Sequence, residues 1–379
     1  MSSNDPQAAS PAPDIAELVP SQRAEIVYRW DLDKTYLQTE FSTFRGHLRA
    51  AVEGAKHKRT VPGMQALLVA LSQAYRARVV VVSGSPTQLR ARILRMFQLH
   101  GVHCDRLVLK DFVGLIRKGR LKAITNQVPY KLRAHLETRL WLAAREEAVP
   151  EICFGDDAEV DALIYCLYAD VCAGRVAGPR LDRILQVCGA YPDEIAAILG
   201  KLPLLPSGET VRRIFIHLEG NSPPSRYGAY RGRVTATFNA LQIALSLAQD
   251  GLCDDRILIA VAEELVRDHC VDAAGLAGSI EDAVRRGLCS PELGCRVVSE
   301  LLPRTAAFDV GFQPAFAARL RRTLQSAGPP VQDTAPLPLP YEQLFESEQA
   351  FARARKLAIK TAGRIAGLSE FLESAREDD

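Results

Sequence analysis

The chain has 379 residues, of which 47% are hydrophobic and 24% are charged, and its formal net charge is +2. This balance is ordinary for a globular protein, and the low net charge argues against a specific nucleic-acid binder. No apolar run approaches the roughly 20 residues that cross a bilayer, and the N-terminus lacks the basic and apolar regions of a signal peptide. We therefore expect a cytoplasmic protein of two domains or one large one.

The first informative stretch follows residues 1–22, whose Ser, Pro and Ala content predicts a disordered leader. The β-prone segment 25–30 leads into Asp31 and Asp33, one residue apart. Aspartates are poor strand residues, so the strand should end there and present both at its carboxyl end, where open α/β sheets bind ligands. Two carboxylates this close favour a divalent cation or a bound phosphate between them, although an acidic turn at a strand end explains an isolated pair more often than not.

Three later segments also contain groups that can bind a phosphate or a cation beside it. The valines at 79–82 lead into Ser83, and the apolar run 152–154 leads into an acidic cluster. Lys131 lies at the start of a predicted helix, where a cation is unfavourable unless anions lie opposite it. These side chains therefore become candidates for one shared site.

Strand-like and helical patterns alternate through this region. Helical spacing of apolar residues predicts helices over 64–75, 86–100 and 130–147, and 107–109 is predicted as a further strand. Alternation of this kind predicts an α/β fold with a doubly wound parallel sheet.

The motifs and their order resemble the haloacid dehalogenase superfamily of phosphotransferases. Asp-Leu-Asp-Lys-Thr at 31–35 resembles the first motif, and Ser83, Lys131 and Gly-Asp at 155–156 resemble the other three. Within this superfamily, the branch of actin-patch phosphatidate phosphatases and lipins is the one that these motifs resemble. The resemblance rests on Ser-Gly-Ser-Pro at 83–86, Leu-Lys-Asp-Phe at 109–112, Lys-Leu at 131–132 and Gly-Asp at 155–156. The resemblance covers roughly residues 23–176, within a predicted phosphatase domain at 23–180, and Lys34 and Asp157 depart from the usual pattern of that branch.

The resemblance implies a phosphomonoester hydrolase with an aspartyl-phosphate intermediate. Asp31 would be the nucleophile, and Asp33 would protonate the leaving alkoxide and then activate water. Hard oxygen ligands suit Mg²⁺, which Asp31, Asp156 and the backbone carbonyl of Asp33 would hold. Asp157 or Asp161 would complete the acidic set, and the sequence does not choose between them, since each also fits a helix N-cap.

The remaining candidates would contact the substrate. Ser83 would donate a hydrogen bond to a phosphoryl oxygen, and Lys131 would neutralise charge on the phosphoryl group and the nucleophile. Four further residues at the predicted strand ends are candidate substrate contacts, namely Thr35, Gly84, Ser85 and Lys110.

The rest of the chain carries no catalytic pattern. Residues 181–326 are predicted as a helical domain of bundle type, in which 211–218 is either a strand or the start of a buried helix. Residues 327–340 are predicted as a Pro-rich linker and 341–379 as a C-terminal helix. The basic residues within 45–59 could steer an anionic substrate or rest on an anionic surface, or could be an ordinary solvated face.

Three functions remain open at this stage. The leading one is a magnesium-dependent phosphatase whose substrate is a phosphoester, with a phospholipid such as phosphatidate as one candidate, which leaves room for peripheral membrane contact. The second is the same chemistry on a soluble or protein phosphoester. The third is a non-catalytic binding or scaffold protein, which the complete set of motif residues disfavours. The oligomeric state is not predicted.

Overall fold

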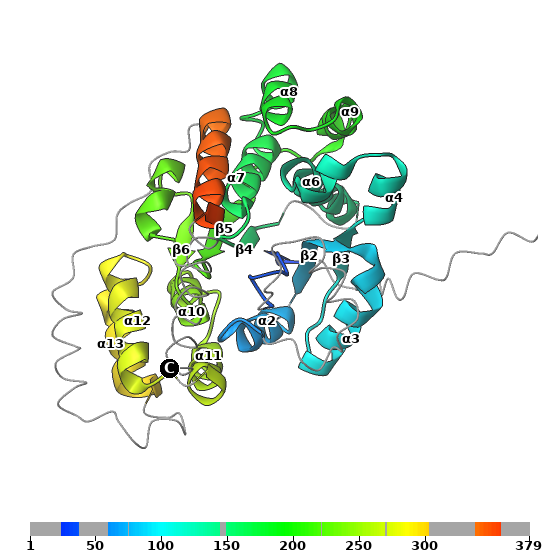
Figure 1. Ribbon diagram of the computed structural model, residues 1–379. Helices are drawn as coiled ribbons and strands as arrows, with labels where there is room; N and C mark the ends of the chain where they lie inside the picture. The colour runs from blue at the N-terminus through cyan, green and yellow to red at the C-terminus, as the bar shows by residue number, and fades with distance from the viewer. Residues whose placement is uncertain are drawn as a thin grey trace, which may run out of the picture.

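The computed structural model describes residues 24–37, 60–74, 76–144, 149–220, 222–269, 271–302 and 338–357. Six parallel strands in these ranges form one sheet in the order β3-β2-β1-β4-β5-β6 (Figure 1). The strands are β1 (Ile26–Trp30), β2 (Ala77–Pro86), β3 (Arg106–Lys110), β4 (Glu151–Asp156), β5 (Val211–His217) and β6 (Thr235–Thr237). The prediction of an α/β fold with a parallel sheet is confirmed.

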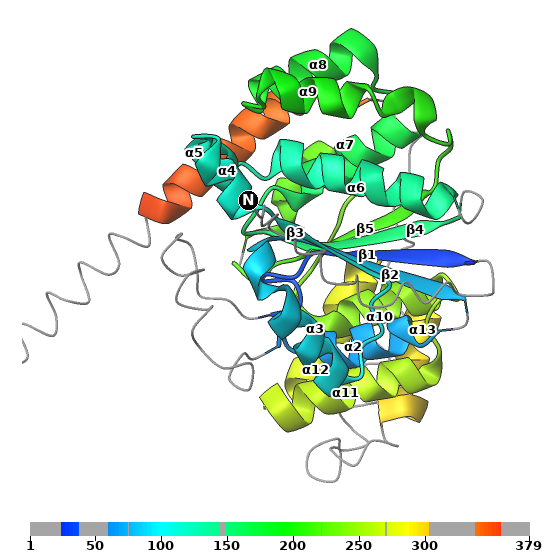
Figure 2. The ribbon, with the colours of Figure 1, turned by 90° about the vertical axis from the view of Figure 1, so that its right-hand side faces the viewer.

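Helices cover both faces of the sheet (Figure 2). One face carries α4 (Phe112–Arg117), α5 (Leu121–Thr125), α6 (Val128–Ala143), α7 (Asp161–Cys172), α8 (Gly178–Val187) and α9 (Pro192–Leu199), with the helix at 341–357 beside them. The opposite face carries α2 (Met64–Ser72), α3 (Arg90–His100), α10 (Ala240–Gln249), α11 (Asp255–His269), α12 (Ala273–Arg285) and α13 (Pro291–Arg296). None of the helices in the described ranges is both long enough and apolar enough to cross a membrane.

The central strands are apolar on both sides because helices cover both sides. Tyr28 and Trp30 point into the hydrophobic cluster formed with α2, α3 and α10 to α13. Val27 and Val80 point the other way, into a cluster with α6. The Trp30 ring stacks on Phe154 of β4 with 4.1 Å between ring centroids, which fixes β1 against its neighbour.

The direction in which the chain adds strands to the sheet reverses between β1 and β4. The chain moves from β1 outward to β2 and β3, and then returns to place β4 on the other side of β1. The connections after β1 and β4 therefore diverge and leave a crevice at the carboxyl ends of these strands, where such sheets bind ligands. Asp31 and Asp156 lie at this crevice, and the Asp31 backbone N–H donates to the carbonyl of Phe154 at 2.9 Å.

The sheet does not end at the domain boundary predicted after residue 180. Strands β5 and β6 extend it, and α10 to α13 share a hydrophobic cluster with β1 and β2. The apolar run of β5 fitted a strand or a buried helix equally well, and the three residues of β6 are too few to show a period. Apart from this correction, the division into domains stays a prediction.

Several predicted segments lie outside the described residues. These are the leader at 1–22, the basic residues within 45–59, and most of the linker at 327–340. Of the predicted C-terminal helix, residues 341–357 are helical and 358–379 lie outside the described ranges.

Candidate active site

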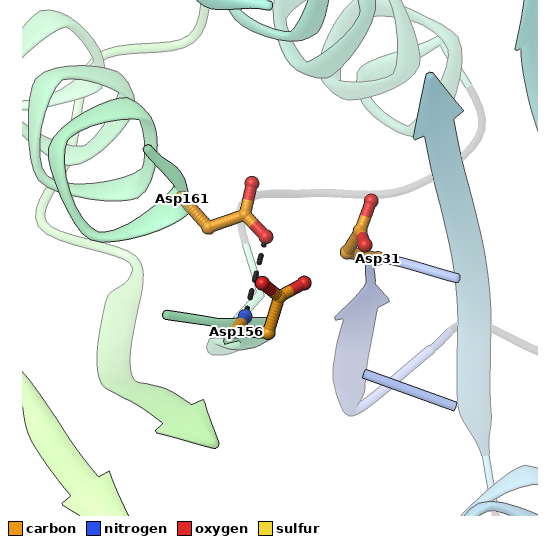
Figure 3. Close-up of side chains that lie close together, drawn as sticks. All are labelled: Asp31, Asp156 and Asp161. Atoms are coloured by element: carbon orange, nitrogen blue, oxygen red, sulfur yellow. Dashed lines mark hydrogen bonds between the residues drawn. The ribbon is translucent and has the colours of Figure 1, made fainter. Parts of the chain in front are cut away.

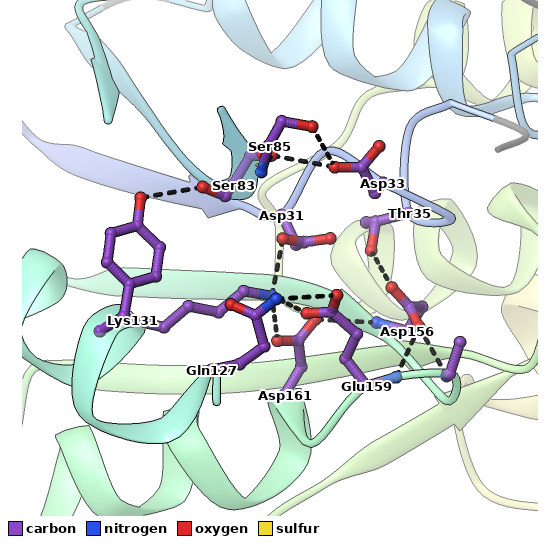
Figure 4. Close-up of polar contacts among 12 residues, drawn as sticks. Asp31, Asp33, Thr35, Ser83, Ser85, Gln127, Lys131, Asp156, Glu159 and Asp161 are labelled. Carbon is purple, nitrogen blue, oxygen red and sulfur yellow. Dashed lines mark hydrogen bonds and ion pairs between the residues drawn. The ribbon is translucent and has the colours of Figure 1, made fainter. Parts of the chain in front are cut away.

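The side chains of Asp31 and Lys131 meet in the crevice, both of them buried. Lys131 lies in the first turn of α6, and its Nζ is 2.7 Å from Oδ1 of Asp31 (Figure 4). The same Nζ is 2.6 Å from Oδ1 of Asp161 and 2.8 Å from Oε2 of Glu159. Oδ2 of Asp31 has no hydrogen-bond partner among the described residues. One oxygen of Asp31 is thus held in place while the other is available for chemistry.

Three buried carboxylates form a group that could hold a metal ion. Asp31 follows β1, Asp156 ends β4 and Asp161 begins α7, and one oxygen from each lies within 4.8 Å of the others (Figure 3). Lys131 forms ion pairs with Asp31, Glu159 and Asp161, so one ammonium is shared by three carboxylates in this part of the described structure. Carboxylate oxygens are the ligands that Mg²⁺ prefers, so this group of three buried acids fits such an ion.

Burial and neighbouring charges shift the pKa values of this group. Burial raises the pKa of Asp31 well above its usual range, and nearby acids add to the rise while Lys131 opposes it. Burial also raises the pKa of Asp156, reinforced by Asp161 and Glu159. For Lys131, burial would lower the pKa, but the surrounding carboxylates outweigh it and raise the pKa well above the usual value. Lys131 is therefore an ammonium, and one ammonium does not compensate the acids around it.

Gly155 allows the close approach of Asp161 to β4. A Cβ at Gly155 would lie 2.6 Å from both Cβ and Oδ2 of Asp161, so any larger residue would displace that carboxylate. The backbone N–H of Asp156 donates to Oδ2 of Asp161 at 3.3 Å. The glycine before Asp156 is thus required by the packing of the acidic group.

Asp156 is fixed by hydrogen bonds from three directions. Its Oδ1 accepts from the backbone N–H groups of Ala158 at 2.6 Å and Glu159 at 3.2 Å. Its Oδ2 accepts from Oγ1 of Thr35 at 3.3 Å. Thr35 therefore lies beside the acidic group, and its predicted contact with substrate stays a prediction.

Asp33 belongs to a second polar group on the other side of Asp31. Its Oδ2 accepts hydrogen bonds from Oγ of Ser83 at 3.0 Å and Oγ of Ser85 at 2.7 Å. The Ser85 backbone N–H donates to Oγ of Ser83 at 2.9 Å, and the hydroxyl of Tyr130 donates to the Ser83 carbonyl at 2.8 Å. The first two motifs predicted from sequence thus touch directly, through the ends of β1 and β2.

Asp157 and Asp161, between which the sequence did not choose, have different partners in the structure. Oδ1 of Asp157 accepts from the Gly220 backbone N–H at 2.7 Å, and Oδ2 accepts from the Ser222 backbone N–H at 3.0 Å. Its carboxylate therefore holds the segment after β5, whereas Asp161 joins Asp31 and Asp156. The metal roles of these residues and of the Asp33 carbonyl stay predictions.

Lys110, a predicted substrate contact, has a different set of partners. Its Nζ donates to the carbonyls of Ile124 at 3.0 Å and Asn126 at 2.8 Å, and lies 4.9 Å from the centre of the Tyr130 ring. Burial lowers its pKa to about 7. The Lys110 side chain thus connects the end of β3 to α5 and to the segment between α5 and α6. Direct contact of Lys110 with substrate stays a prediction.

A pocket of about 560 Å³ opens beside Asp33. Its lining comes from the segments after β1 and β4, from the end of β2, from α4 to α6 with their connections, from the residues after α8, and from the helix at 341–357. The lining residues are Asp33, Lys34, Gly84, Phe112, Lys122, Ile124, Thr125, Asn126, Gln127, Val128, Ala158, Glu159, Val160, Cys188, Gly189, Phe345, Glu348, Gln349 and Ala352.

Three parts of this site were not predicted from the sequence. Glu159, which pairs with Lys131, was not predicted as a site residue. Its place in the same acidic run as Asp156 and Asp161 was a usable signal in the sequence. Tyr130, which positions Ser83, is adjacent to Lys131. The pocket residues from 341–357 had no signal, because nothing in their spacing indicates which surface the helix covers.

Carboxylates, two serine hydroxyls and one ammonium at the switch point of a parallel sheet make up the kind of site that binds a phosphate group together with a divalent cation. In agreement, residues 30–178 match the family model of the phosphatidate phosphatase APP1, catalytic domain. The match covers less than half of the chain, contains every site residue predicted from sequence, and supports a phosphatase that hydrolyses phosphomonoesters. No curated protein and no solved structure matches the chain.

Proposed function

We propose that the protein is a Mg²⁺-dependent phosphomonoester hydrolase of the haloacid dehalogenase type that acts on phosphatidate or a closely related phospholipid. The observation that carries this proposal is the buried Asp31, with Oδ1 held by Lys131 and Oδ2 without a partner, inside the segment that matches a phosphatidate phosphatase domain. A carboxylate held in this way has one oxygen aimed at a substrate and a neighbouring cation to stabilise negative charge.

The reaction would proceed in two displacements. Oδ2 of Asp31 attacks phosphorus, the bond from phosphorus to the alcohol oxygen breaks, and Asp33 donates a proton to that oxygen. Asp33 then takes a proton from water as the water oxygen attacks the aspartyl-phosphate, which releases inorganic phosphate and restores the Asp31 carboxylate. Asp33 is suited to this role because it lines the pocket, and Ser83 and Ser85 fix its orientation.

The other polar groups would bind the phosphoryl group and the metal ion and would neutralise negative charge. Lys131 holds Asp31 and balances charge that develops on the phosphoryl oxygens, and Ser83 can turn its hydroxyl from Asp33 to such an oxygen. Asp31, Asp156 and Asp161 would hold Mg²⁺, together with the backbone carbonyl of Asp33. When bound, Mg²⁺ would supply positive charge to the phosphoryl oxygens.

The phospholipid substrate and the place of action are part of the proposal. The family whose model matches residues 30–178 is described as a phosphatidate phosphatase, and this description supports a lipid substrate. We propose a cytoplasmic protein that reaches its substrate by peripheral contact with a membrane surface.

Phosphate release from a panel of substrates tests this function. The panel contains phosphatidate in mixed micelles, a sugar phosphate, a nucleotide and a phosphopeptide, each with Mg²⁺ and with EDTA. The wild type should release phosphate from phosphatidate only with Mg²⁺, and Asp31→Asn should lower turnover by several orders of magnitude. Asp254→Asn is the matched control, because Asp254 is exposed and caps α11 by accepting from the Ile257 backbone N–H, which asparagine also does.

Three results would contradict parts of this proposal. Undiminished turnover by Asp31→Asn would exclude Asp31 as the nucleophile. Full activity in EDTA would exclude the metal. Preference for the sugar phosphate, nucleotide or phosphopeptide over phosphatidate would replace the lipid substrate with a soluble or protein phosphoester.

A further inference from the structure

The helix at 341–357 forms one wall of the pocket beside Asp33, although it lies outside the segment that matches the phosphatase family. Phe345, Gln349 and Ala352 lie on this wall. The spacing of three and four residues puts them on one face of the helix. Phe112 and Ile124 lie on the wall contributed by α4 and α5. The pocket is thus bounded by parts of the chain that are far apart in the sequence.

Buried contacts fix this helix against the phosphatase fold. Tyr341, Leu344 and Phe345 belong to the hydrophobic cluster of α7 and α8. The Glu348 carboxylate, almost completely buried, forms an ion pair with Arg226 and accepts a hydrogen bond from the Tyr230 hydroxyl at 2.8 Å. An ion pair with this little exposure holds its geometry better than a surface pair. The wall is therefore held in a defined position.

A second set of contacts connects this helix to the end of β4. Asp157, directly after Asp156, holds the backbone N–H groups of Gly220 and Ser222. Gly220 in turn lies against Arg355, since a Cβ there would be 2.3 Å from Nη2 of that arginine. The residue next to a proposed metal ligand thus positions the segment on which the helix packs.

The opposite wall is also held in place. Lys110 donates to the carbonyls of Ile124 and Asn126, and both of these residues line the pocket. Gln127 packs against Gly84, where a Cβ would lie 2.5 Å from its Nε2. Both walls are therefore built from fixed groups, as in most small-molecule sites.

We infer that this pocket receives the apolar part of the leaving alcohol, and that Phe345, Gln349 and Ala352 determine specificity for it. This inference rests on the proposed function, since Asp33 lines the pocket and the oxygen that it protonates belongs to that alcohol. The alcohol therefore extends from Asp33 into the pocket. Sites of roughly 300–1,000 Å³ hold small molecules, so about 560 Å³ suits a glycerol with the first carbons of its acyl chains.

The lining favours this occupant over a more polar one. The side chains of Phe112, Ile124, Val128, Val160 and Phe345 form the apolar part of the lining, beside the charged Lys34, Lys122, Glu159 and Glu348 and the polar Asn126, Gln127 and Gln349. A sugar or nucleotide alcohol would leave its hydroxyl groups against these apolar side chains, which costs binding free energy. The pocket thus favours the alcohol of a phospholipid.

A matched pair of alanines on the helix tests the inference. Ala352 lines the pocket, whereas Ala350 does not, and both are exposed, so a tryptophan at either position can be accommodated without disturbing the core. The measurement is kcat/KM for dioctanoyl phosphatidate, used as a monomer, and for p-nitrophenyl phosphate. In Ala352→Trp the ratio of these two values should fall by roughly tenfold or more, because the indole occupies space needed by the lipid. In Ala350→Trp the ratio should stay at the wild-type value.

Binding provides a second measurement that does not depend on turnover. In the Asp31→Asn background with Mg²⁺, Ala352→Trp should weaken the affinity for dioctanoyl phosphatidate by roughly tenfold, and Ala350→Trp should leave it unchanged. An unchanged ratio and affinity in Ala352→Trp, or an equal loss in both variants, would overturn the inference while the phosphatase function stood. A wild type that hydrolyses neither substrate would overturn the proposed function, and the inference with it.

Discussion

The Nζ atom of Lys131 lies 2.7 Å from Oδ1 of Asp31, and this contact joins the start of α6 to the end of β1. Both side chains are buried, and two further carboxylates share the same ammonium. The ammonium of Lys131 is thus shared by three carboxylates beside the end of β1. Each of the following predictions depends on this arrangement or on the walls of the pocket beside it.

Removal of the ammonium should affect both stability and catalysis. Lys131→Met leaves Asp31 and Asp161 buried without a cation, which should lower the free energy of unfolding in EDTA by about 3–5 kcal/mol. Turnover should fall by about 10²–10³-fold, because the charge that stabilises the phosphoryl group is lost. Urea denaturation and phosphate release measure the two effects, with Lys118→Met at an exposed position as the control. A Lys131→Met protein with normal turnover would exclude a catalytic role for the lysine.

Mg²⁺ binding should distinguish the two acids of the fourth motif. Asp161→Asn removes one of three clustered carboxylates and should weaken Mg²⁺ affinity by at least about tenfold. Asp157→Asn keeps the affinity near the wild-type value, because the Asp157 carboxylate faces the backbone of Gly220 and Ser222. Calorimetric titration of each variant with Mg²⁺ is the measurement. Equal losses in both variants would place Asp157 in the metal site and contradict the geometry.

The ion pair of Glu348 should control the mobility of the pocket wall. Glu348→Ala leaves Arg226 without its carboxylate and removes the acceptor of the Tyr230 hydroxyl, at a cost of about 1–3 kcal/mol. Hydrogen exchange in 341–357 should become faster, whereas Glu346→Ala, at an exposed position on the same helix, should change it little. Equal protection of this helix in the wild type and Glu348→Ala would show that the ion pair does not hold it.

The stability of the fold should depend on pH through Lys110. Burial lowers the pKa of Lys110 to about 7, from an ordinary value of 10.5. Between these two values the unfolded chain binds more protons than the folded protein, so the free energy of unfolding rises with pH, by up to about 1.4 kcal/mol per pH unit. Below pH 7 both states are protonated and this contribution is constant.

Comparison with Lys110→Met isolates the effect of this one group. In urea denaturation at pH 7, 8 and 9, the free energy of unfolding of the wild type should rise relative to that of the variant. A difference that does not change over this range would show that Lys110 keeps an ordinary pKa in the folded protein.

The sequence predicted that the candidate site residues lie together, because parallel strands end at the same edge of a sheet. Asp31, Ser83 and Asp156 each follow an apolar run, and the structure brings them together at the carboxyl ends of β1, β2 and β4. The choice between Asp157 and Asp161 was out of reach, because it depends on the backbone N–H groups of Gly220 and Ser222. These donors follow β5, which the sequence left open between strand and helix.

The surface on which the helix at 341–357 packs could not be predicted, for a different reason. Its apolar residues predict an amphipathic helix, but the pattern is the same whether the helix covers its own fold or a second molecule. The surface that it covers is decided by pairs such as Arg226 with Glu348, and long-range pairs of this kind have no local signal. For the same reason, the strands β5 and β6 were assigned to a separate helical region.

Trapping of the proposed covalent intermediate on Asp31 tests the mechanism most directly. Borohydride reduces an aspartyl-phosphate to homoserine, so a sample quenched during turnover of phosphatidate with Mg²⁺ can be reduced, digested and mapped by mass spectrometry. The mechanism predicts homoserine at position 31, and none when substrate is omitted. Homoserine at another aspartate, or turnover of phosphatidate without any reducible intermediate, would contradict it.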